Sequence, residues 1–270
     1  MKKLVILSLT FAFALCSFAQ GNRPQRKGGF GRRPPMQRQQ DPALVKLSET
    51  FVADSLTTDD FELFYCSKEY KTDEKQPCLF LYLHGGGGRN ETSNRHVQHA
   101  ALLALDTYLN EHHLNSVVIA PICPKGKSWE RISTQLYALI HSVCEKMNID
   151  QSSIYLMGTS FGAQGGWGLL AERTDIFAAA QLASAAPKHY DIEKVVKTPI
   201  YFTLGENDMD KPSMYESVIE KFREKGAEII AKTIRENEKP VLGLATGSSP
   251  IGTYKELIKM YEAGNLSFAN

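Results

Sequence analysis

The sequence has no apolar run long enough to cross a membrane, no marked excess of either charge and no cluster of metal-binding side chains. Its longest apolar run, residues 4–15, is about a dozen residues long, whereas a hydrocarbon core needs roughly twenty. Lysine and arginine (31) balance aspartate and glutamate (30), and no aromatic residues are interleaved with the basic ones. No Cys and His residues have zinc-site spacing. Stable membrane insertion, nucleic-acid binding and a zinc site are therefore not expected.

The amino-terminal end has instead the three zones of a secretory signal peptide. Residues 1–3 are basic, residues 4–15 are apolar, and small residues follow, so we expect cleavage after Ala19. A lipoprotein site at Cys16 is less favoured, because the residue before it is the large Leu15. The protein is therefore expected to be secreted or periplasmic.

Cysteine is scarce, and removal of the signal peptide leaves four residues: Cys66, Cys78, Cys123 and Cys144. An oxidising compartment would allow disulfides, and an even number permits pairing without proving it. A bridge between Cys66 and Cys78 is geometrically possible, because both lie at the ends of predicted strands joined by a short polar stretch. Buried free thiols are the favoured alternative.

Composition divides the chain into four predicted segments. Residues 1–19 form the signal peptide. Residues 20–42 are rich in Gly, Pro, Gln and Arg, with almost no aliphatic side chains, and predict a basic disordered linker. Residues 43–226 read as one α/β domain, and residues 227–270 differ from it in character. No internal repeat is evident.

Apolar runs and helical periodicity alternate from about residue 43. Continuous apolar runs at residues 78–83, 116–120, 153–157 and 199–204 predict parallel strands buried on both faces. Residues 51–52 and 61–66 predict an antiparallel start to the same sheet. Helical spacing of apolar residues covers 97–110, 133–147, 163–173, 213–225, 227–237 and 253–263, and residues 240–245 predict a further strand. This alternation is typical of a mostly parallel sheet flanked by helices.

Ser160 lies in a Gly-x-Ser-x-Gly pentapeptide, residues 158–162, between a predicted strand and a predicted helix. The pentapeptide alone is weak, because background glycine and serine usage produces it by chance. A strand, a sharp turn and a helix in this order expose a serine hydroxyl for nucleophilic attack. Glycine is needed on both sides because a side chain at either position would collide inside so tight a turn. The context therefore predicts a nucleophile elbow.

A second glycine-rich loop, residues 85–88, follows the predicted strand 78–83 and His84. Such a backbone can direct amide groups at an oxyanion, and we expect the N–H of Gly86 to act together with the N–H of Phe161, at the start of the helix after the nucleophile. His84 ends its strand as part of this loop, and a structural role is favoured for it over that of a base.

An acid is expected after the strand at residues 199–204. Asp208 is the candidate that would orient an imidazole, and Glu206 and Asp210 are the alternatives. A solvated loop carboxylate with no catalytic role is also compatible with the pattern.

Together, the His-Gly-Gly loop, the segment from the Pro-Ile-Cys-Pro stretch to Trp129 (residues 121–129) and the serine elbow make residues 45–225 resemble the α/β-hydrolase superfamily. The likeness is greatest to secreted esterases of the polyhydroxybutyrate-depolymerase and feruloyl or acetylxylan esterase kind. That resemblance implies hydrolysis of carboxylic esters through an acylated Ser160, with no metal or cofactor.

The sequence lacks the histidine that such esterases supply after the acid. The last histidine is His189, which precedes Asp208. A serine without a base to accept its proton is a poor nucleophile, and loss of a triad member costs several orders of magnitude in rate. His189 follows the strand-like residues 177–186 and is a less favoured substitute. We therefore expect a C-terminally truncated hydrolase domain with impaired activity.

Residues 239–257 resemble the amino-terminal part of glucosamine-6-phosphate deaminase, and residues 227–270 as a whole read as a βα fragment of that Rossmann-like fold. The resemblance implies that the turn formed by Thr246, Gly247, Ser248 and Ser249 contacts a sugar phosphate. The deaminase catalytic segments are not expected within residues 227–270. Residues 240–245 are expected to extend the hydrolase sheet, so that a join near Gly226 leaves the domain compact.

Three functional classes stay open on these grounds. The first is a serine carboxylesterase that acts on a small-molecule ester or a polysaccharide ester, such as an acylated polysaccharide, and that is impaired by the missing histidine. The second is a non-catalytic relic of such an enzyme. The third is a glucosamine-6-phosphate deaminase fragment without the deaminase catalytic residues.

Overall fold

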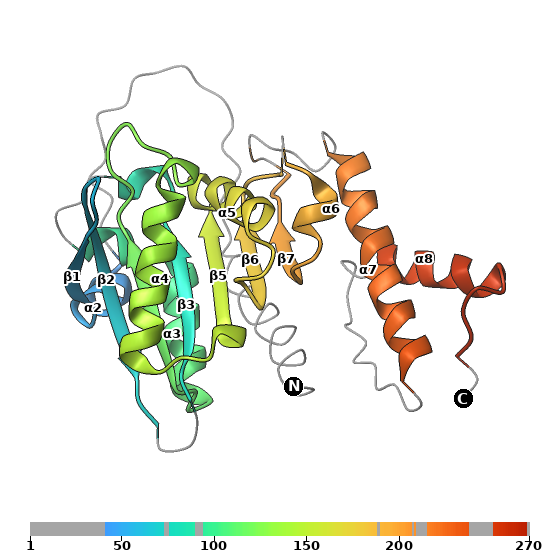
Figure 1. Cartoon of the computed structure of the whole chain (residues 1–270), viewed down its shortest axis with the longest axis horizontal. Coiled ribbons are helices and arrows are strands. Elements are labelled where there is room, and N and C mark those ends of the chain that lie inside the picture. Colours follow the sequence, from blue (N-terminus) through green and yellow to red (C-terminus); the bar gives the residue numbers. More distant parts are fainter. Residues whose placement is uncertain are drawn as a thin grey trace.

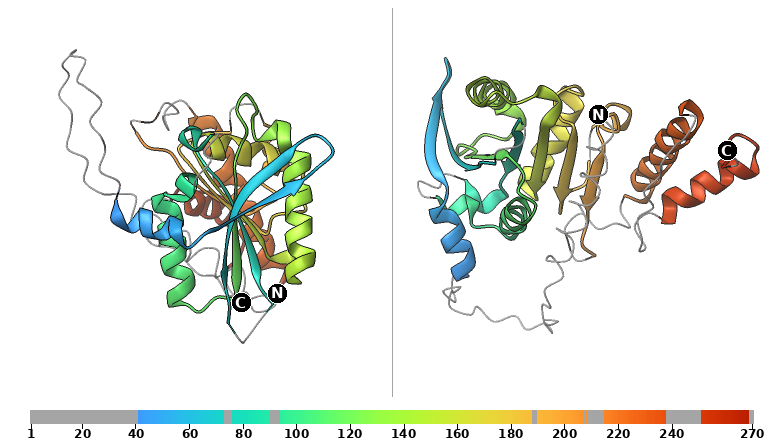
Figure 2. Two further views of the ribbon diagram at one scale, coloured as in Figure 1. Left: turned by 90° about the vertical axis from the view of Figure 1, so that its left-hand side faces the viewer. Right: turned by 90° about the horizontal axis from the view of Figure 1, so that it is seen from below.

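A computed structural model describes residues 41–72, 76–89, 94–187, 190–206, 208, 215–237 and 251–268. The expected signal peptide and nearly all of the expected linker lie outside these ranges. Within them, the chain forms a seven-stranded mixed sheet with helices on both faces (Figures 1 and 2). None of the helices in this part of the chain is long and apolar enough to cross a membrane.

The strands follow the order β1-β2-β4-β3-β5-β6-β7 across the sheet. The first two strands pair antiparallel, β2 pairs antiparallel with β4, and the remaining pairs are parallel. Their bounds are β1 (Val52–Thr57), β2 (Glu62–Tyr70), β3 (Cys78–Leu83), β4 (Ser116–Pro121), β5 (Ile154–Thr159), β6 (Ala179–Ala183) and β7 (Ile200–Thr203). The predicted antiparallel start and parallel continuation are thus confirmed.

Helices cover both faces of this sheet (Figure 2). Their bounds are α2 (Pro42–Glu49), α3 (Ala100–Glu111), α4 (Ser133–Met147), α5 (Phe161–Glu172), α6 (Ile192–Val195), α7 (Glu216–Glu236) and α8 (Ile251–Glu262). Short 3-10 turns join them: η1 (Gly86–Gly88), η2 (Asn94–Val97), η3 (Glu130–Ile132) and η4 (Gln151–Ser153). Helix α2 was not predicted, and it begins at the last residue of the expected linker.

Strand β3 shows why the buried strands read as continuous apolar runs. Side chains alternate between the two faces of a strand, so Leu79, Leu81 and Leu83 enter the core formed with α4 and α5. Phe80 and Tyr82 enter the core formed with α2 and α3. Both faces of the sheet centre are therefore dry, and every position of β3 favours an apolar residue.

Helix α7 carries the chain across the predicted join near Gly226 without a break. Its first half packs on the hydrolase-like core, where the Phe222 ring contacts Trp167 and Phe202 at centroid distances of 5.7 and 5.2 Å. Its second half packs against α8 in a separate small core. The two helices predicted on either side of Gly226 are therefore one helix, and α7 and α8 lie beyond the β7 edge of the sheet (Figure 1).

The small core between α7 and α8 is formed by five buried side chains, Ala227, Ala231, Ile234, Leu257 and Leu266. Gly226 faces α8, where an added Cβ would lie 3.4 Å from the Thr253 side chain. In the described residues β7 is the last strand of the sheet, and the strand predicted at 240–245 lies outside them.

The four cysteines in the described residues are all free thiols, which agrees with the favoured expectation and not with a bridge between Cys66 and Cys78. Burial raises the pKa of the Cys66, Cys123 and Cys144 thiols to about 11. These thiols therefore stay protonated at neutral pH and act as small apolar core groups.

Candidate active site

The sheet has a topological switch at β3, where the chain turns from one direction of strand addition to the other. Strand β3 pairs with β4 on one side and with β5 on the other. In open α/β sheets, a crevice forms beyond the carboxyl ends of the strands at such a point. The glycine loop after β3 and Ser160 after β5 both lie there, so the fold brings the two predicted features together.

Ser160 occupies a strained turn between β5 and α5. Its backbone has φ 54° and ψ −115°, outside the regions that non-glycine residues favour, and its side chain is exposed. The Ser160 N–H donates to the Ala183 carbonyl at 2.7 Å, and the Ser160 carbonyl accepts from the Gln164 N–H at 2.9 Å. Strain held by neighbouring elements clusters at functional sites, so this turn is a candidate nucleophile elbow.

The glycines on either side of Ser160 are required by close backbone approach, as the sequence suggested. A Cβ on Gly158 would lie 2.6 Å from the Gly162 carbonyl oxygen. A Cβ on Gly162 would lie 1.9 Å from the carbonyl oxygen of Leu83, at the end of β3. Helix α5 can therefore begin directly against β3 only because these positions have no side chain.

The glycine loop runs beside the serine. A Cβ built on Gly85 would lie 3.7 Å from Ser160 Cβ and 3.3 Å from the Thr159 carbonyl oxygen. Residues Gly86–Gly88 then form a 3-10 turn, closed by a bond of 3.1 Å from the Gly88 N–H to the Gly85 carbonyl. Gly86 is exposed, and Phe161 is the first residue of α5, where backbone N–H groups have no intrahelical acceptor. Phe161 therefore follows the nucleophile directly, and Gly86 follows the loop residue that lies beside Ser160.

His84 holds this loop in place through hydrogen bonds of both its ring nitrogens. Its Nε2 accepts the Cys123 N–H at 3.0 Å, so its Nδ1 carries the proton and donates to the Gly85 carbonyl at 2.7 Å. The ring is buried, and burial lowers the pKa of His84 to about 4, although the bond to Gly85 opposes this shift. A neutral imidazole with both nitrogens engaged cannot accept a proton from Ser160, which agrees with a structural role.

The candidate acid lies at the same edge of the sheet. Strand β6 separates β5 from β7, with Thr159 opposite Ala183 and Ala183 opposite Thr203. Asp208 follows β7, and its Oδ2 accepts the Gly205 N–H at 2.9 Å within its own turn. Asp208 thus follows a strand that lies two positions away in the sheet from the strand before Ser160.

No described histidine is placed as the base for Ser160. The Nε2 of His96 lies 2.9 Å from the Ala120 carbonyl oxygen, and His99 caps α3 through its Nδ1. His141 is exposed on α4 beside Glu145, and two further histidines follow α3. His189, the less favoured substitute, lies outside the described residues. In the part of the chain that the structure describes, a glycine loop lies beside Ser160 and a candidate acid follows β7, but no histidine is placed as a base.

Several further predicted site residues also lie outside the described ranges: Asp210, Thr246, Gly247, Ser248 and Ser249. Glu206 is described, and it is exposed at the end of β7.

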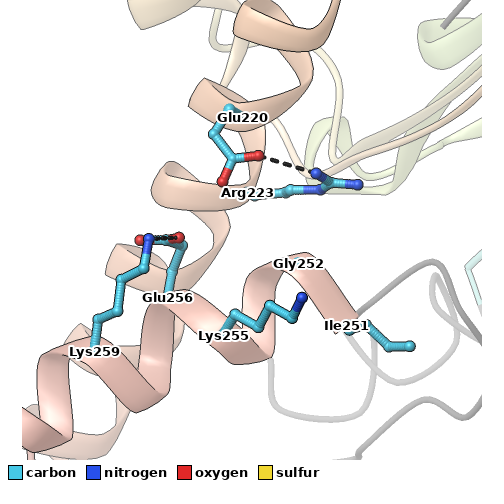
Figure 3. A pocket seen from close by; sticks show the side chains of 7 residues that line it. All are labelled: Glu220, Arg223, Ile251, Gly252, Lys255, Glu256 and Lys259. Carbon is cyan, nitrogen blue, oxygen red and sulfur yellow. Dashed lines mark hydrogen bonds and ion pairs between the residues drawn. The ribbon is translucent and has the colours of Figure 1, made fainter. Parts of the chain in front are cut away.

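A charged hollow of about 360 Å³ lies elsewhere, between α7 and α8. Arg223 pairs with Glu220 at 2.9 Å and Lys259 with Glu256 at 2.6 Å, so two of its cations are neutralised by their own helices (Figure 3). The other lining residues are Ile251, Gly252 and Lys255. None of them borders Ser160, and we assign the hollow no ligand.

Arg89, which the sequence did not single out, and Trp129, which ends the segment 121–129 of the predicted resemblance, both contact Phe161. Arg89 follows the glycine loop, and its guanidinium carbon lies 3.7 Å from the centre of the Phe161 ring. Trp129 is fully buried between His84 and Phe161, at ring distances of 4.9 and 6.2 Å. The readable signal for Arg89 was its place directly after four glycines. Nothing local in the sequence indicated the position of Trp129.

No protein-family model matches the chain. Among solved structures, it is similar to a thermostable esterase with a TM-score of 0.57 at 20% identity, over 80% of this chain and 64% of that one. It is also similar to the feruloyl esterase module from Clostridium thermocellum, with a TM-score of 0.52 at 13% identity over 75% and 81%. A ferulic acid esterase from Anaeromyces mucronatus gives 0.50 at 15% identity over 64% and 79%. At these identities the likeness shows the fold, which is of the α/β-hydrolase type.

The curated relatives that match the chain agree with the second predicted resemblance, which is to glucosamine-6-phosphate deaminase. The chain is 53% identical over 51 residues to glucosamine-6-phosphate deaminase of Thermoanaerobacter sp. (strain X514), which is 19% of this chain and 20% of that protein. It is 54% identical over 44 residues to glucosamine-6-phosphate deaminase 1 of Bacillus subtilis (strain 168), which is 16% of this chain and 18% of that protein. The chain thus spans about a fifth of the curated relatives it matches. Both predicted resemblances, to esterases and to the deaminase, are confirmed.

Proposed function

We propose that the α/β-hydrolase part of the chain is a serine hydrolase of carboxylic esters that acts through Ser160, with activity limited by the lack of an imidazole. The observation that carries this proposal is the exposed, strained Ser160 turn, which borders the glycine loop at the switch point of the sheet. This arrangement presents a nucleophile beside two backbone donors, as acyl transfer requires.

The chemistry follows from the placement of these groups. The Ser160 Oγ attacks the ester carbonyl and loses its proton as the tetrahedral intermediate forms. The N–H groups of Gly86 and Phe161 donate to the oxyanion, and such a donor is worth about 3 kcal/mol of transition-state stabilisation. The alcohol then leaves with a proton, and water hydrolyses the acyl-enzyme by the same route. No step requires a metal or cofactor.

Removal of the Ser160 proton is the weak step. An imidazole held by Asp208 would accept it, whereas the described residues leave this task to water or hydroxide. Losing a triad base costs several orders of magnitude, although the oxyanion hole and substrate binding still give about 10³–10⁴-fold over the uncatalysed reaction. We therefore expect slow acylation that accelerates with rising pH.

The proposed substrate is a carboxylic ester, either a small molecule or an ester group on a polysaccharide. Two of the structural neighbours act as feruloyl or ferulic acid esterases, which supports this class. Secretion or a periplasmic location would give access to such polymers, and it rests on the signal peptide predicted from the sequence. The phosphate contacts predicted at residues 246–249 stay a prediction, and we propose no deaminase activity.

Labelling with a fluorophosphonate probe tests the proposal. Wild type should form a covalent adduct located at Ser160 by peptide mass spectrometry, and Ser160→Ala should form none. Ser152→Ala is the matched control, because Ser152 is exposed at the opposite end of β5 and should not affect labelling. Equally poor labelling of wild type and Ser160→Ala, even at high pH, would instead support a non-catalytic relic.

A further inference from the structure

Arg89 places a cation beside the glycine loop and the Phe161 ring. It follows the glycine turn Gly86–Gly88 directly, and its side chain is half-buried. Its guanidinium carbon lies 3.7 Å from the centre of the ring of Phe161, the residue after the nucleophile. A guanidinium stacked on an aromatic face keeps its N–H groups in the plane of the stack, directed sideways. Arg89 therefore presents a donor edge beside Phe161, which follows Ser160 in the chain.

This cation has no anionic partner within the described residues. No carboxylate there forms a salt bridge with Arg89, and its Nε–H is enclosed without a hydrogen-bond partner. Two other described arginines are paired with acids: Arg173 makes a two-pronged contact with Asp175, and Arg223 bonds to Glu220. Arg89 thus differs from them, since a buried donor without an acceptor costs free energy that needs an explanation.

Two groups near Arg89 are neutral, and the carboxylate of Glu130, which also acts on Cys123, accepts a hydrogen bond from Tyr190. His84 stays uncharged because burial lowers its pKa to about 4, and Cys123 stays a thiol because burial raises its pKa to about 11. Neither compensates the positive charge. A planar anion reaching the half-buried guanidinium would supply the missing negative charge, in the geometry that arginine offers to carboxylates.

We propose that Arg89 binds a carboxylate carried by the ester substrate, on its acyl or alcohol part, so that the site selects acidic esters over neutral ones. This proposal rests on the proposed esterase function, because it takes the ligand to be an ester substrate. Binding of the carboxylate to Arg89 does not itself require acylation of Ser160. Arg89 is thus a specificity-determining residue, because its side chain contacts the substrate away from the reacting carbonyl.

The test measures binding in the Ser160→Ala background, where no substrate is consumed. Ligand-observed NMR would give dissociation constants for monoethyl adipate, which is anionic, and for its neutral monoamide of the same length. The anionic ester should bind on the order of tenfold more tightly than the amide, as expected for one charge-assisted contact. Arg89→Gln should abolish this preference while leaving the affinity for the amide unchanged, and Arg89→Lys should keep part of it.

Arg95→Gln is the matched control, since Arg95 is exposed on the nearby turn η2 and its loss changes the net charge equally. It should leave the tenfold preference intact. Equal affinity for the two ligands in the Ser160→Ala protein would overturn the proposal, as would an equal loss of both affinities in Arg89→Gln and Arg89→Lys. Failure of the fluorophosphonate experiment alone would overturn the esterase function and leave this binding result standing.

Discussion

The contact between α5 and β3 predicts the effect of adding a single methyl group at Gly162. The new Cβ would lie 1.9 Å from the Leu83 carbonyl oxygen, 2.5 Å from the Leu83 carbonyl carbon and 2.8 Å from the His84 carbonyl oxygen. These are backbone atoms at the end of a central strand, and no side-chain rotation removes them. Helix α5 must therefore move away from β3 by about 1 Å to reach the shortest separation that real Cβ atoms show.

We expect Gly162→Ala to destabilise the protein by about 3 kcal/mol, the upper end for overpacking, because rigid backbone must move. For a domain of this size this corresponds to a fall in Tm of about 6–12 °C. Urea unfolding followed by tryptophan fluorescence would measure the loss. The same shift separates Ser160 from the glycine loop, and a misplacement of about 1 Å can cost 10²-fold in rate.

Gly87→Ala is the matched control. An added Cβ at Gly87 meets no atom within 4 Å, so the same substitution should change the stability by less than about 0.5 kcal/mol. Equal unfolding midpoints for Gly162→Ala and Gly87→Ala would show that the packing of α5 on β3 does not depend on the absence of a side chain at residue 162.

Three further predictions concern groups around the site. The pKa of His84 is about 4 in the folded protein and 6.5 ordinarily, so its contribution to the free energy of unfolding is complete above pH 6.5 and is lost as the pH falls toward 4. In urea unfolding, wild type should therefore lose about 2 kcal/mol more stability than His84→Asn between pH 7 and pH 5. Parallel stability profiles of the two proteins would contradict this. Tyr190→Phe removes a 2.6 Å hydrogen bond to Glu130 and should cost about 1–2 kcal/mol by the same assay, with an unchanged midpoint as the contrary result. Phe222→Ala should lower the free energy of unfolding by about 2–3 kcal/mol and speed amide hydrogen exchange in α7, because the Phe222 ring holds that helix on the sheet. Unchanged exchange in α7 would disprove that role.

Much of the sheet could be predicted from the sequence, because strands buried on both faces are continuous apolar runs. The elbow could be predicted for a related reason: a strand, Gly158, Ser160, Gly162 and a helix follow one another within a few residues, so all the requirements of the turn are local. The favoured role of His84 as part of the loop also agrees with the structure.

The remaining features depend on contacts between distant segments or on weak local signals. The guanidinium of Arg89 has no anionic partner among the described residues, and no sequence pattern can show that a partner is missing. Helix α7 continues through Gly226 because its two halves pack on different cores, although glycine is a poor interior helix residue. Helix α2 had a readable start, since Asp41 caps it and Pro42 occupies its first turn, but its composition matched the linker before it.

We propose above all that Ser160 lies in a site for acyl transfer that has no base among the described residues. The most direct test is the rate of fluorophosphonate labelling at neutral pH as imidazole is added from outside. The labelling rate of wild type should be low and should rise in proportion to the imidazole concentration. Ser160→Ala should not be labelled at any imidazole concentration. Labelling that is already fast without imidazole would show that a base is present, and labelling that stays absent at high imidazole would show that Ser160 is not a nucleophile.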